Sequence, residues 1–254
     1  MKSKSNLHAR KELNAKPYLI DITLLRDNIP SFDVYPFSLP VIRNLKTLTF
    51  HPDVTFFVGE NGAGKSTLLE AIAQMLRFNP EGGNKNTLFS TRETHSDLNK
   101  YLRIGKSYKM PTDGFFLRAE SFYNVASYID DVGYAGAYGG KSLHSQSHGE
   151  SFLALLNNKF KGNGLYLLDE PEAALSPSRQ LSALVVIDRL VKSESQFIIA
   201  THSPIILAYP NAKIYLFSEE GIHEIAYEET EHYKIAKDFL DHRDQMLHAL
   251  LEES

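Results

Sequence analysis

The stretch Gly59-Glu60-Asn61-Gly62-Ala63-Gly64-Lys65-Ser66-Thr67 matches the phosphate-binding pattern GxxxxGK[ST] at every required position. The residues before it, 54–58, read as a short buried strand, and the apolar residues after it recur at helical spacing. Glycines let such a loop curl until its N–H groups surround a β-phosphate at the positive end of the following helix. The stretch therefore predicts a strand, a phosphate loop and a helix that together bind ATP or GTP.

All nine residues of this loop, 59–67, are expected to line the nucleotide site. Lys65 is expected to reach the β- and γ-phosphates, and the Ser66 hydroxyl to hold Mg²⁺. The alternative is a glycine-rich turn that contains Lys-Ser by chance. A strand on one side and a helix on the other argue against that alternative.

Length and composition restrict the class of protein. The chain has 254 residues, 43% of them apolar, which suits one large α/β domain or one domain with a small appendage. Its net charge of −4 argues against an overall basic nucleic-acid binder. It has no cysteine, which excludes disulfides and thiolate metal sites and fits a reducing cytoplasm. No apolar run is long enough to span a bilayer, and residues 1–16 do not resemble a secretory signal.

Charge is unevenly distributed along the chain. Residues 1–17 form a basic segment that we expect to be a flexible arm, solvated or in contact with phosphate or an acidic partner. Residues 218–231 contain six glutamates and neither Lys nor Arg.

Strand and helix patterns alternate along the chain, which predicts an α/β fold with a largely parallel sheet and the nucleotide at its strand ends. The expected strands are 18–29, 45–50, 54–58, 114–118, 165–168 and 197–200, followed by a hairpin of 214–217 and 222–227. The expected helices are the one after the phosphate loop, a polar appendage at 87–107, then 150–160, 177–191 and a tail at 231–251 that is one helix or a broken pair.

Two acids end the apolar strand at 165–168. The first, Asp169, is expected to order the Mg²⁺ shell beside Ser66. The second, Glu170, projects to the other side and can polarise the attacking water as a general base. A GTPase would not normally carry a glutamate at this point, so the pair favours ATP. The alternative is an acidic turn that faces solvent.

A second strand end, at residues 197–204, also carries polar groups. His202 is expected to hydrogen-bond the γ-phosphate or the water, because its strand should lie beside the Asp169 strand. Thr201 or Ser203 are candidates for sensing phosphate. The other nine histidines have no comparable setting and are interpreted as surface or core residues.

In this order the motifs resemble those of the ATP-binding-cassette (ABC) superfamily of ATPases, and the soluble RecF/SMC-like and OLD-like branch more than transporter subunits. Residues 59–67 match the Walker A motif of that family, and residues 165–169 match its Walker B motif. Glu170 falls on the catalytic glutamate and His202 on the switch histidine. The resemblance implies an ABC-type ATPase head with antiparallel N-terminal strands, a mostly parallel sheet and a small helical appendage.

The segment 147–151 resembles the signature motif of the family in part. Ser147, Gly149 and Glu150 would contact the nucleotide bound to the opposite subunit, so the resemblance implies a head-to-tail homodimer with two ATP molecules between its subunits. A serine that caps the following helix is the simpler interpretation, and both can hold.

Three positions depart from the pattern of the family or stay open. No glutamine occurs between Gln74 and Gln146, so Glu120 is the best substitute for the metal-contacting glutamine, with Arg118 as a rival. Ser176 stands where an aspartate is usual in the D-loop. Tyr35 and Phe37 are the candidates for stacking on adenine, although either could pack in the core.

We expect a basic arm at 1–17 and a single ABC-type ATPase domain at 18–254. This domain would hold a variable, helical insertion at about 79–146 and a C-terminal hairpin and helices at about 212–254. The expected function is Mg²⁺-dependent ATP hydrolysis by an ATP-bound homodimer that couples nucleotide state to a partner protein or to DNA. An ATP-gated regulator of a nuclease or toxin is the alternative, and a transporter ATPase subunit is the weaker one.

Overall fold

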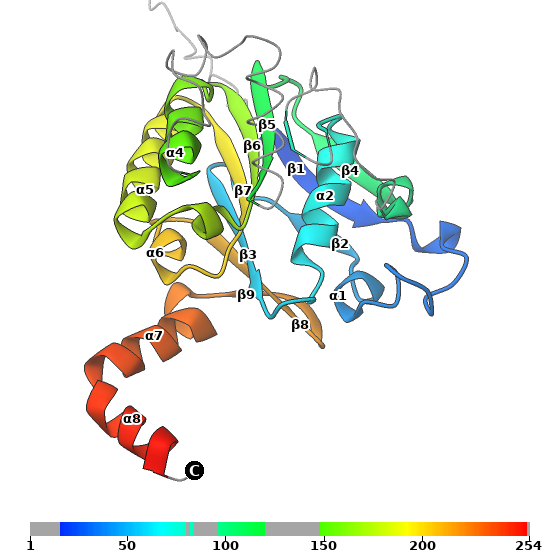
Figure 1. The fold of residues 1–254 in the computed structure, drawn as a ribbon. Helices are drawn as coiled ribbons and strands as arrows, with labels where there is room; N and C mark the ends of the chain where they lie inside the picture. The colour runs from blue at the N-terminus through cyan, green and yellow to red at the C-terminus, as the bar shows by residue number, and fades with distance from the viewer. Residues whose placement is uncertain (1–15, 80–81, 84–95, 120–147, 253–254) are drawn as a thin grey trace, which may run out of the picture.

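The computed structural model describes residues 16–79, 82–83, 96–119 and 148–252. A six-stranded sheet forms its centre, in the order β5-β6-β7-β3-β8-β9 (Figure 1). The first five strands in that order are parallel, and β9 runs antiparallel to β8. Their bounds are Asp113–Arg118, Gly164–Asp169, Gln196–Ala200, Val54–Gly59, Lys213–Ser218 and Gly221–Ile225.

The three central strands are covered on both faces. Every residue of β3, β6 and β7 is buried, as continuous apolar runs in a parallel sheet require. Their side chains alternate between two apolar clusters, so that Phe56 belongs to one cluster and Phe57 to the other. The predicted α/β fold with a largely parallel sheet is confirmed.

Helices cover one face of this sheet, and helix α2 with a smaller sheet covers the other (Figure 1). On the first face lie α4 (His148–Asn158), α5 (Pro177–Lys192) and α6 (Pro204–Leu207). On the second lie α2 (Lys65–Met75), α1 (Pro40–Arg43) and the antiparallel sheet β2-β1-β4, whose strands are Thr47–Thr49, Leu19–Leu24 and Leu102–Lys106. Four short 3-10 turns complete the described elements, at Arg26–Asn28, Asp97–Tyr101, Pro171–Ala174 and Tyr227–Glu229.

A buried glutamine joins the two sheets. Gln196, at the start of β7, accepts from the Leu19 N–H and donates to the Leu19 carbonyl, both at 2.9 Å, and donates to the His51 carbonyl at 3.0 Å. Its amide therefore pairs with β1 as a neighbouring strand would. Lys16, which we expected in the basic arm, is 5% exposed and forms an ion pair with Asp53, so its charge is neutralised within the domain.

Some elements differ from the prediction. The strand expected at 18–29 ends at Leu24, because a 3-10 turn follows at Arg26–Asn28. The helical prediction for 87–107 is wrong at Leu102–Lys106, which forms strand β4 against β1. Residues 87–95, the first part of that stretch, lie outside the described residues.

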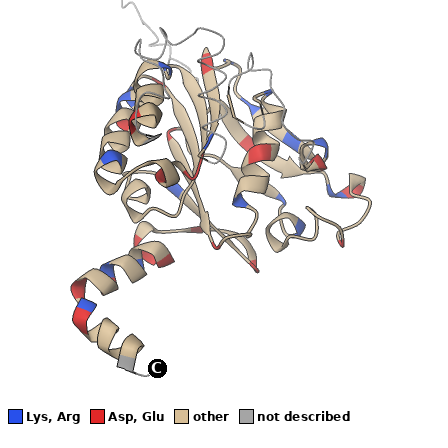
Figure 2. Cartoon of the chain, viewed as in Figure 1, with Lys and Arg blue, Asp and Glu red and all other residues tan. Residues whose placement is uncertain are grey.

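The C-terminal tail is a broken pair of helices, α7 (Glu231–Asp241) and α8 (Arg243–Glu252), which leads away from the body of the molecule (Figure 1). Neither helix has a buried residue among those whose burial is described. Both signs of charge occur on α7 and at its junction with α8 (Figure 2), where Lys237 pairs with Asp241 and His242 with Asp238.

Candidate functional site at the ends of three parallel strands

The phosphate loop connects β3 to α2 and is held together by its own lysine. Lys65 Nζ donates to the carbonyls of Gly59 and Glu60, each at 2.8 Å. Gly59 and Gly64 have φ angles of +142° and +96°, which favour glycine. Burial lowers the pKa of Lys65 below its ordinary value, while Glu170 and Asp169 oppose this shift.

The side chain of Ser66, at the start of α2, contacts that of Asp169, at the end of β6. Ser66 Oγ donates to Asp169 Oδ1 at 2.9 Å, and Asp169 is buried. A hydroxyl and a carboxylate are oxygen ligands of the kind that Mg²⁺ prefers, and Mg²⁺ commonly takes only one or two protein carboxylates, with water and phosphate as its other ligands. The donor set therefore fits Mg²⁺, although no group of three or more acids or histidines suited to a metal occurs in the described part of the chain.

Arg118 lies beside the same carboxylate. Its Nε is 3.4 Å from Asp169 Oδ2, and its Nη1 is 3.4 Å from Glu70 Oε2. The structure thus places one candidate for the missing glutamine next to the expected magnesium ligand. The other candidate, Glu120, lies outside the described residues.

Glu170 turns away from the end of β6 through a left-handed backbone conformation. Its φ and ψ are 50° and 52°, and its N–H donates to the Ala200 carbonyl at 2.9 Å. A non-glycine residue rarely adopts this conformation, and strained residues of this kind cluster at active sites. The Glu170 side chain is 38% exposed, and its Oε1 lies 3.7 Å from His202 Nε2.

A third acid of the segment 169–172, which the sequence analysis did not single out, holds the loop after β7. Glu172 accepts from the His202 N–H and, at 2.7 Å, from Thr201 Oγ1, and burial raises its pKa. Ser203 Oγ donates to Gln180 Oε1 at 2.6 Å and caps α6. Thr201 and Ser203 are thus bonded within the protein, and their role in sensing phosphate stays a prediction.

His202 has a histidine partner from the C-terminal part of the chain. His202 Nδ1 lies 2.9 Å from Nε2 of His232, the second residue of α7. The prediction that all other histidines are ordinary surface or core residues is therefore wrong for His232. Thirty residues separate the two rings in sequence, and no spacing pattern marked them as neighbours.

The remaining candidates belong to the signature segment and to the D-loop. Ser147 lies outside the described residues. Glu150 on α4 forms an ion pair of 3.0 Å with Arg179 of α5, and a Cβ added to Gly149 would meet the same arginine at 2.7 Å. Ser176, the D-loop position, is the N-cap residue of α5, and its Oγ lies 3.2 Å from that of Ser178.

The two aromatic candidates have different surroundings. Phe37 is buried and packs edge-on against Tyr101 at 4.9 Å, so it belongs to the core. Tyr35 is 63% exposed, and its hydroxyl lies 3.1 Å from Thr67 Oγ1 at the end of the phosphate loop. Tyr35 is therefore the better placed of the two to meet an adenine ring.

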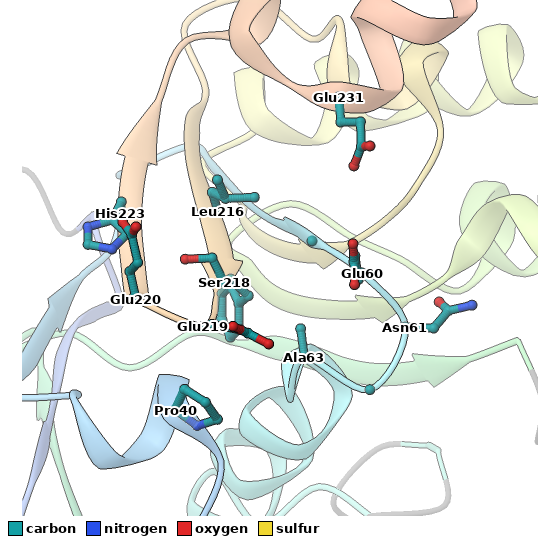
Figure 3. Close-up of a pocket in the computed structure, with 13 residues that line it drawn as sticks. Pro40, Glu60, Asn61, Ala63, Leu216, Ser218, Glu219, Glu220, His223 and Glu231 are labelled. Atoms are coloured by element: carbon teal, nitrogen blue, oxygen red, sulfur yellow. The ribbon is translucent and has the colours of Figure 1, made fainter.

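A cavity of about 740 Å³ lies between the outer side of the phosphate loop and the β8–β9 hairpin (Figure 3). Four carboxylates line it, those of Glu60, Glu219, Glu220 and Glu231. Figure 3 shows Glu231 of α7 directed into the cavity from above. These acids repel phosphate, so the polyphosphate belongs on the side of the loop where Lys65 and Ser66 lie.

The predicted residues come together because β6, β7 and β3 are adjacent in the sheet. Asp169 is in register with Ala200, and Ala200 with Phe57, so that three strand ends bring Lys65, Ser66, Glu170 and His202 to one edge. The arrangement can bind a triphosphate, hold an Mg²⁺ ion and present a carboxylate to water.

Comparisons with known proteins find similar chains among ATP-binding proteins. The model of the AAA domain family matches residues 28–114. An ABC transporter ATP-binding protein of Geobacter sulfurreducens is 24% identical over 74% of this chain and 73% of its own length. ModF of Escherichia coli, also an ABC transporter ATP-binding protein, is 29% identical over 64% of this chain but only 38% of its own length.

Among solved structures, the SMC head domain from Thermotoga maritima superimposes with a TM-score of 0.45 and 15% identity, over 82% of this chain and 98% of its own. None of the described helices combines the length and the hydrophobicity that a bilayer span requires.

Proposed function

This chain is a P-loop ATPase of the ABC superfamily, and from that premise we propose that it works as a head-to-tail homodimer with ATP between its subunits. It binds ATP and hydrolyses it. The nucleotide state of the dimer is coupled to a partner, either a protein effector or DNA.

One observation carries this proposal. The phosphate loop, Asp169, Glu170 and His202 share one edge of the sheet, and the Glu170 side chain is still 38% exposed. A catalytic carboxylate acts best where bulk water is excluded. A second subunit laid over this edge would complete the enclosure, and Ser147, Gly149 and Glu150 are the residues that we expect it to contribute.

The roles in hydrolysis follow from the positions of the side chains. When ATP binds, Lys65 Nζ gives up its hydrogen bonds to the carbonyls of Gly59 and Glu60 and donates to the phosphates instead. Ser66 and Asp169 would hold Mg²⁺, which would supply neutralisation of the phosphate charge when bound. Glu170 accepts a proton from the attacking water, and His202 donates a hydrogen bond to the γ-phosphate. Positioning and electrostatics supply most of the rate enhancement.

Replacing Glu170 by glutamine tests the catalytic and the dimer parts together. Glu170→Gln keeps the size of the side chain but removes the base, so we expect kcat to fall by about 10²- to 10⁴-fold while ATP still binds. With saturating ATP and Mg²⁺, the variant should accumulate at twice the monomer mass of 28.7 kDa in light scattering.

Lys65→Ala is the matched control, because it should lose both ATP binding and the ATP-dependent dimer. A Glu170→Gln chain that remains monomeric with saturating ATP contradicts the sandwich. A variant with unchanged kcat contradicts the role of Glu170 as a base.

The partner can be identified by what changes the ATPase rate. DNA as the partner predicts binding that appears only with ATP and weakens as salt is raised. A protein effector, such as a nuclease or toxin, predicts slow basal hydrolysis that the effector stimulates and DNA does not.

A second candidate function is that of a transporter ATPase subunit, which the names of the Geobacter sulfurreducens and Escherichia coli relatives favour. It predicts that the chain purifies from its own cells together with an integral membrane protein. Recovery with DNA or with an effector, and without any membrane protein, argues against it.

A further inference from the structure

His232 lies beside His202 at the start of α7, which hydrogen bonds hold in place. Thr230 caps α7, donates to the Tyr227 carbonyl at 2.7 Å and is 1% exposed. The Tyr227 hydroxyl donates to the carbonyl of Pro204 at 2.9 Å, two residues after His202. The start of α7 is thus tied to the loop that carries His202, and the hydrogen bond between the two rings is part of this contact.

Hydrogen positions are inferred from partners, and the rings can share their proton in two ways. In the first, His232 Nε2–H donates to His202 Nδ1, and the other nitrogen of His202, Nε2, carries a proton. In the second, His202 Nδ1–H donates to His232, and His202 Nε2 is left with a lone pair. The two remaining nitrogens, His202 Nε2 and His232 Nδ1, are buried and have no hydrogen-bond partner among the described residues.

The Glu170 carboxylate favours the first arrangement. His202 Nε2 faces a carboxylate oxygen of Glu170 at 3.7 Å, which attracts an N–H and repels a lone pair. In the second arrangement the buried N–H would lie on His232 Nδ1, which faces no such carboxylate among the described residues, and a buried N–H far from any acceptor is rare in proteins.

Both rings are expected to be neutral at pH 7, so the choice between tautomers applies there. Burial lowers the pKa of His202, with Lys65 acting in the same direction and Glu170 against it. Burial also lowers the pKa of His232, helped by His202 and Lys65 and opposed by Glu231 and Glu172.

We infer that His232 is a positioning residue for ATP hydrolysis, which fixes His202 as the tautomer with a proton on Nε2 and so directs that N–H toward the reacting phosphate. The inference rests on the proposed role of His202. His232 itself does not touch the nucleotide. It also links the start of the C-terminal helices to the catalytic edge of the sheet.

The tautomer can be read directly, without any variant. We expect long-range ¹H–¹⁵N spectra of the ¹⁵N-histidine-labelled full chain at pH 7.5 to show His202 protonated at Nε2 and not at Nδ1. His202→Gln and His232→Gln serve only to assign the signals. A spectrum with His202 protonated at Nδ1 overturns the inference.

Kinetics then test the positioning role. His232→Phe keeps a ring but cannot donate, so kcat should fall on the order of tenfold while the KM for ATP stays unchanged. His232→Gln keeps an N–H that can reach Nδ1 and should restore most of kcat. His242→Phe, at the exposed end of the same helix, should leave both constants unchanged.

Equal kcat values for the wild type and His232→Phe overturn the positioning role, and so does a loss in His232→Gln as large as in His232→Phe. A wild-type chain without ATPase activity contradicts the proposed function instead, while the spectra still decide the tautomer.

Discussion

Two glycines of the phosphate loop are required for different reasons, one for its backbone conformation alone and the other also for lack of space. Gly59 and Gly62 both have positive φ angles, of +142° and +81°. A Cβ on Gly59 would lie 2.3 Å from the Phe217 carbonyl oxygen of β8, whereas a Cβ on Gly62 would meet nothing within 4 Å. At Gly62 only the backbone conformation requires glycine. At Gly59 the close approach of strand β8 requires it as well.

The two positions therefore predict different losses of stability. Gly62→Ala should lower the free energy of unfolding by about 1–2 kcal/mol, the cost of a left-handed conformation. Gly59→Ala should cost more than about 3 kcal/mol, because β3 and β8 must also move apart. Urea unfolding of both variants measures the difference, and equal losses would contradict the steric role of Phe217.

Lys65, Ser66, Asp169 and Glu170 were predictable because triphosphate chemistry dictates their types and spacing. His232 and Glu172 were not, because their roles depend on which side chains the fold brings against the loop at 201–203. The Asp-Glu-Pro-Glu order held a signal for Glu172, since it adds a third acid to the pair already considered. The sequence held no such signal for His232.

At the scale of elements, the join between the sheets depends on β7 and β1. Gln196 replaces a strand partner for Leu19, and the pairing spans 177 residues of sequence. A polar residue at the first position of an apolar strand looks like an exposed strand end. Its complete burial follows only from the packing of the small sheet against the large one.

Gln196→Leu should therefore destabilise the domain although leucine is more apolar. It leaves the N–H and the carbonyl of Leu19 buried without partners, at a cost of about 2–4 kcal/mol in the free energy of unfolding. Leu181→Gln, at a surface position of α5 that is 58% exposed, is the control and should change it by less than about 0.5 kcal/mol. Guanidinium unfolding that leaves Gln196→Leu as stable as the wild type would contradict the bridging role.

Strand β4 shows why one element was predicted wrongly. Its sequence, Leu-Arg-Ile-Gly-Lys, contains two charges and a glycine and is too short for strand periodicity to be clear. It forms a strand because β1 offers an open edge, to which it pairs in antiparallel register. Pairing with a distant edge is a tertiary effect that local propensity does not report.

At the scale of the molecule, the C-terminal helices divide into an anchored part and a projecting part. The start of α7 is held by Thr230, Tyr227 and His232, as described above. Helix α8 follows α7 after a single residue, and its Leu250 and Leu251 are 64% and 70% exposed. The start of α7 is therefore part of the ATPase domain, whereas α8 adds little to the apolar core.

Removing residues 243–254 should thus change Tm by less than about 2 °C, because almost no apolar burial is lost. Removing residues 231–254 also deletes His232, and should lower kcat as His232→Phe does. Scanning calorimetry and ATPase assays measure these effects. A drop in Tm of more than about 5 °C for the shorter deletion would show that α8 supports the fold.

The sequence by itself determined the phosphate-loop pattern, the two acids Asp169 and Glu170 at the end of β6, the position of His202 at a neighbouring strand end and the parallel α/β class, because these depend on local spacing and on periodicity. Only the tertiary structure decided the partner of His202, the anchor of its loop on Glu172, the contact between Arg118 and Asp169, and the place of β4. Each of these depends on groups far apart in the chain. Their meeting is set by the order of strands in the sheet and by the packing on its two faces, which no short stretch of sequence encodes.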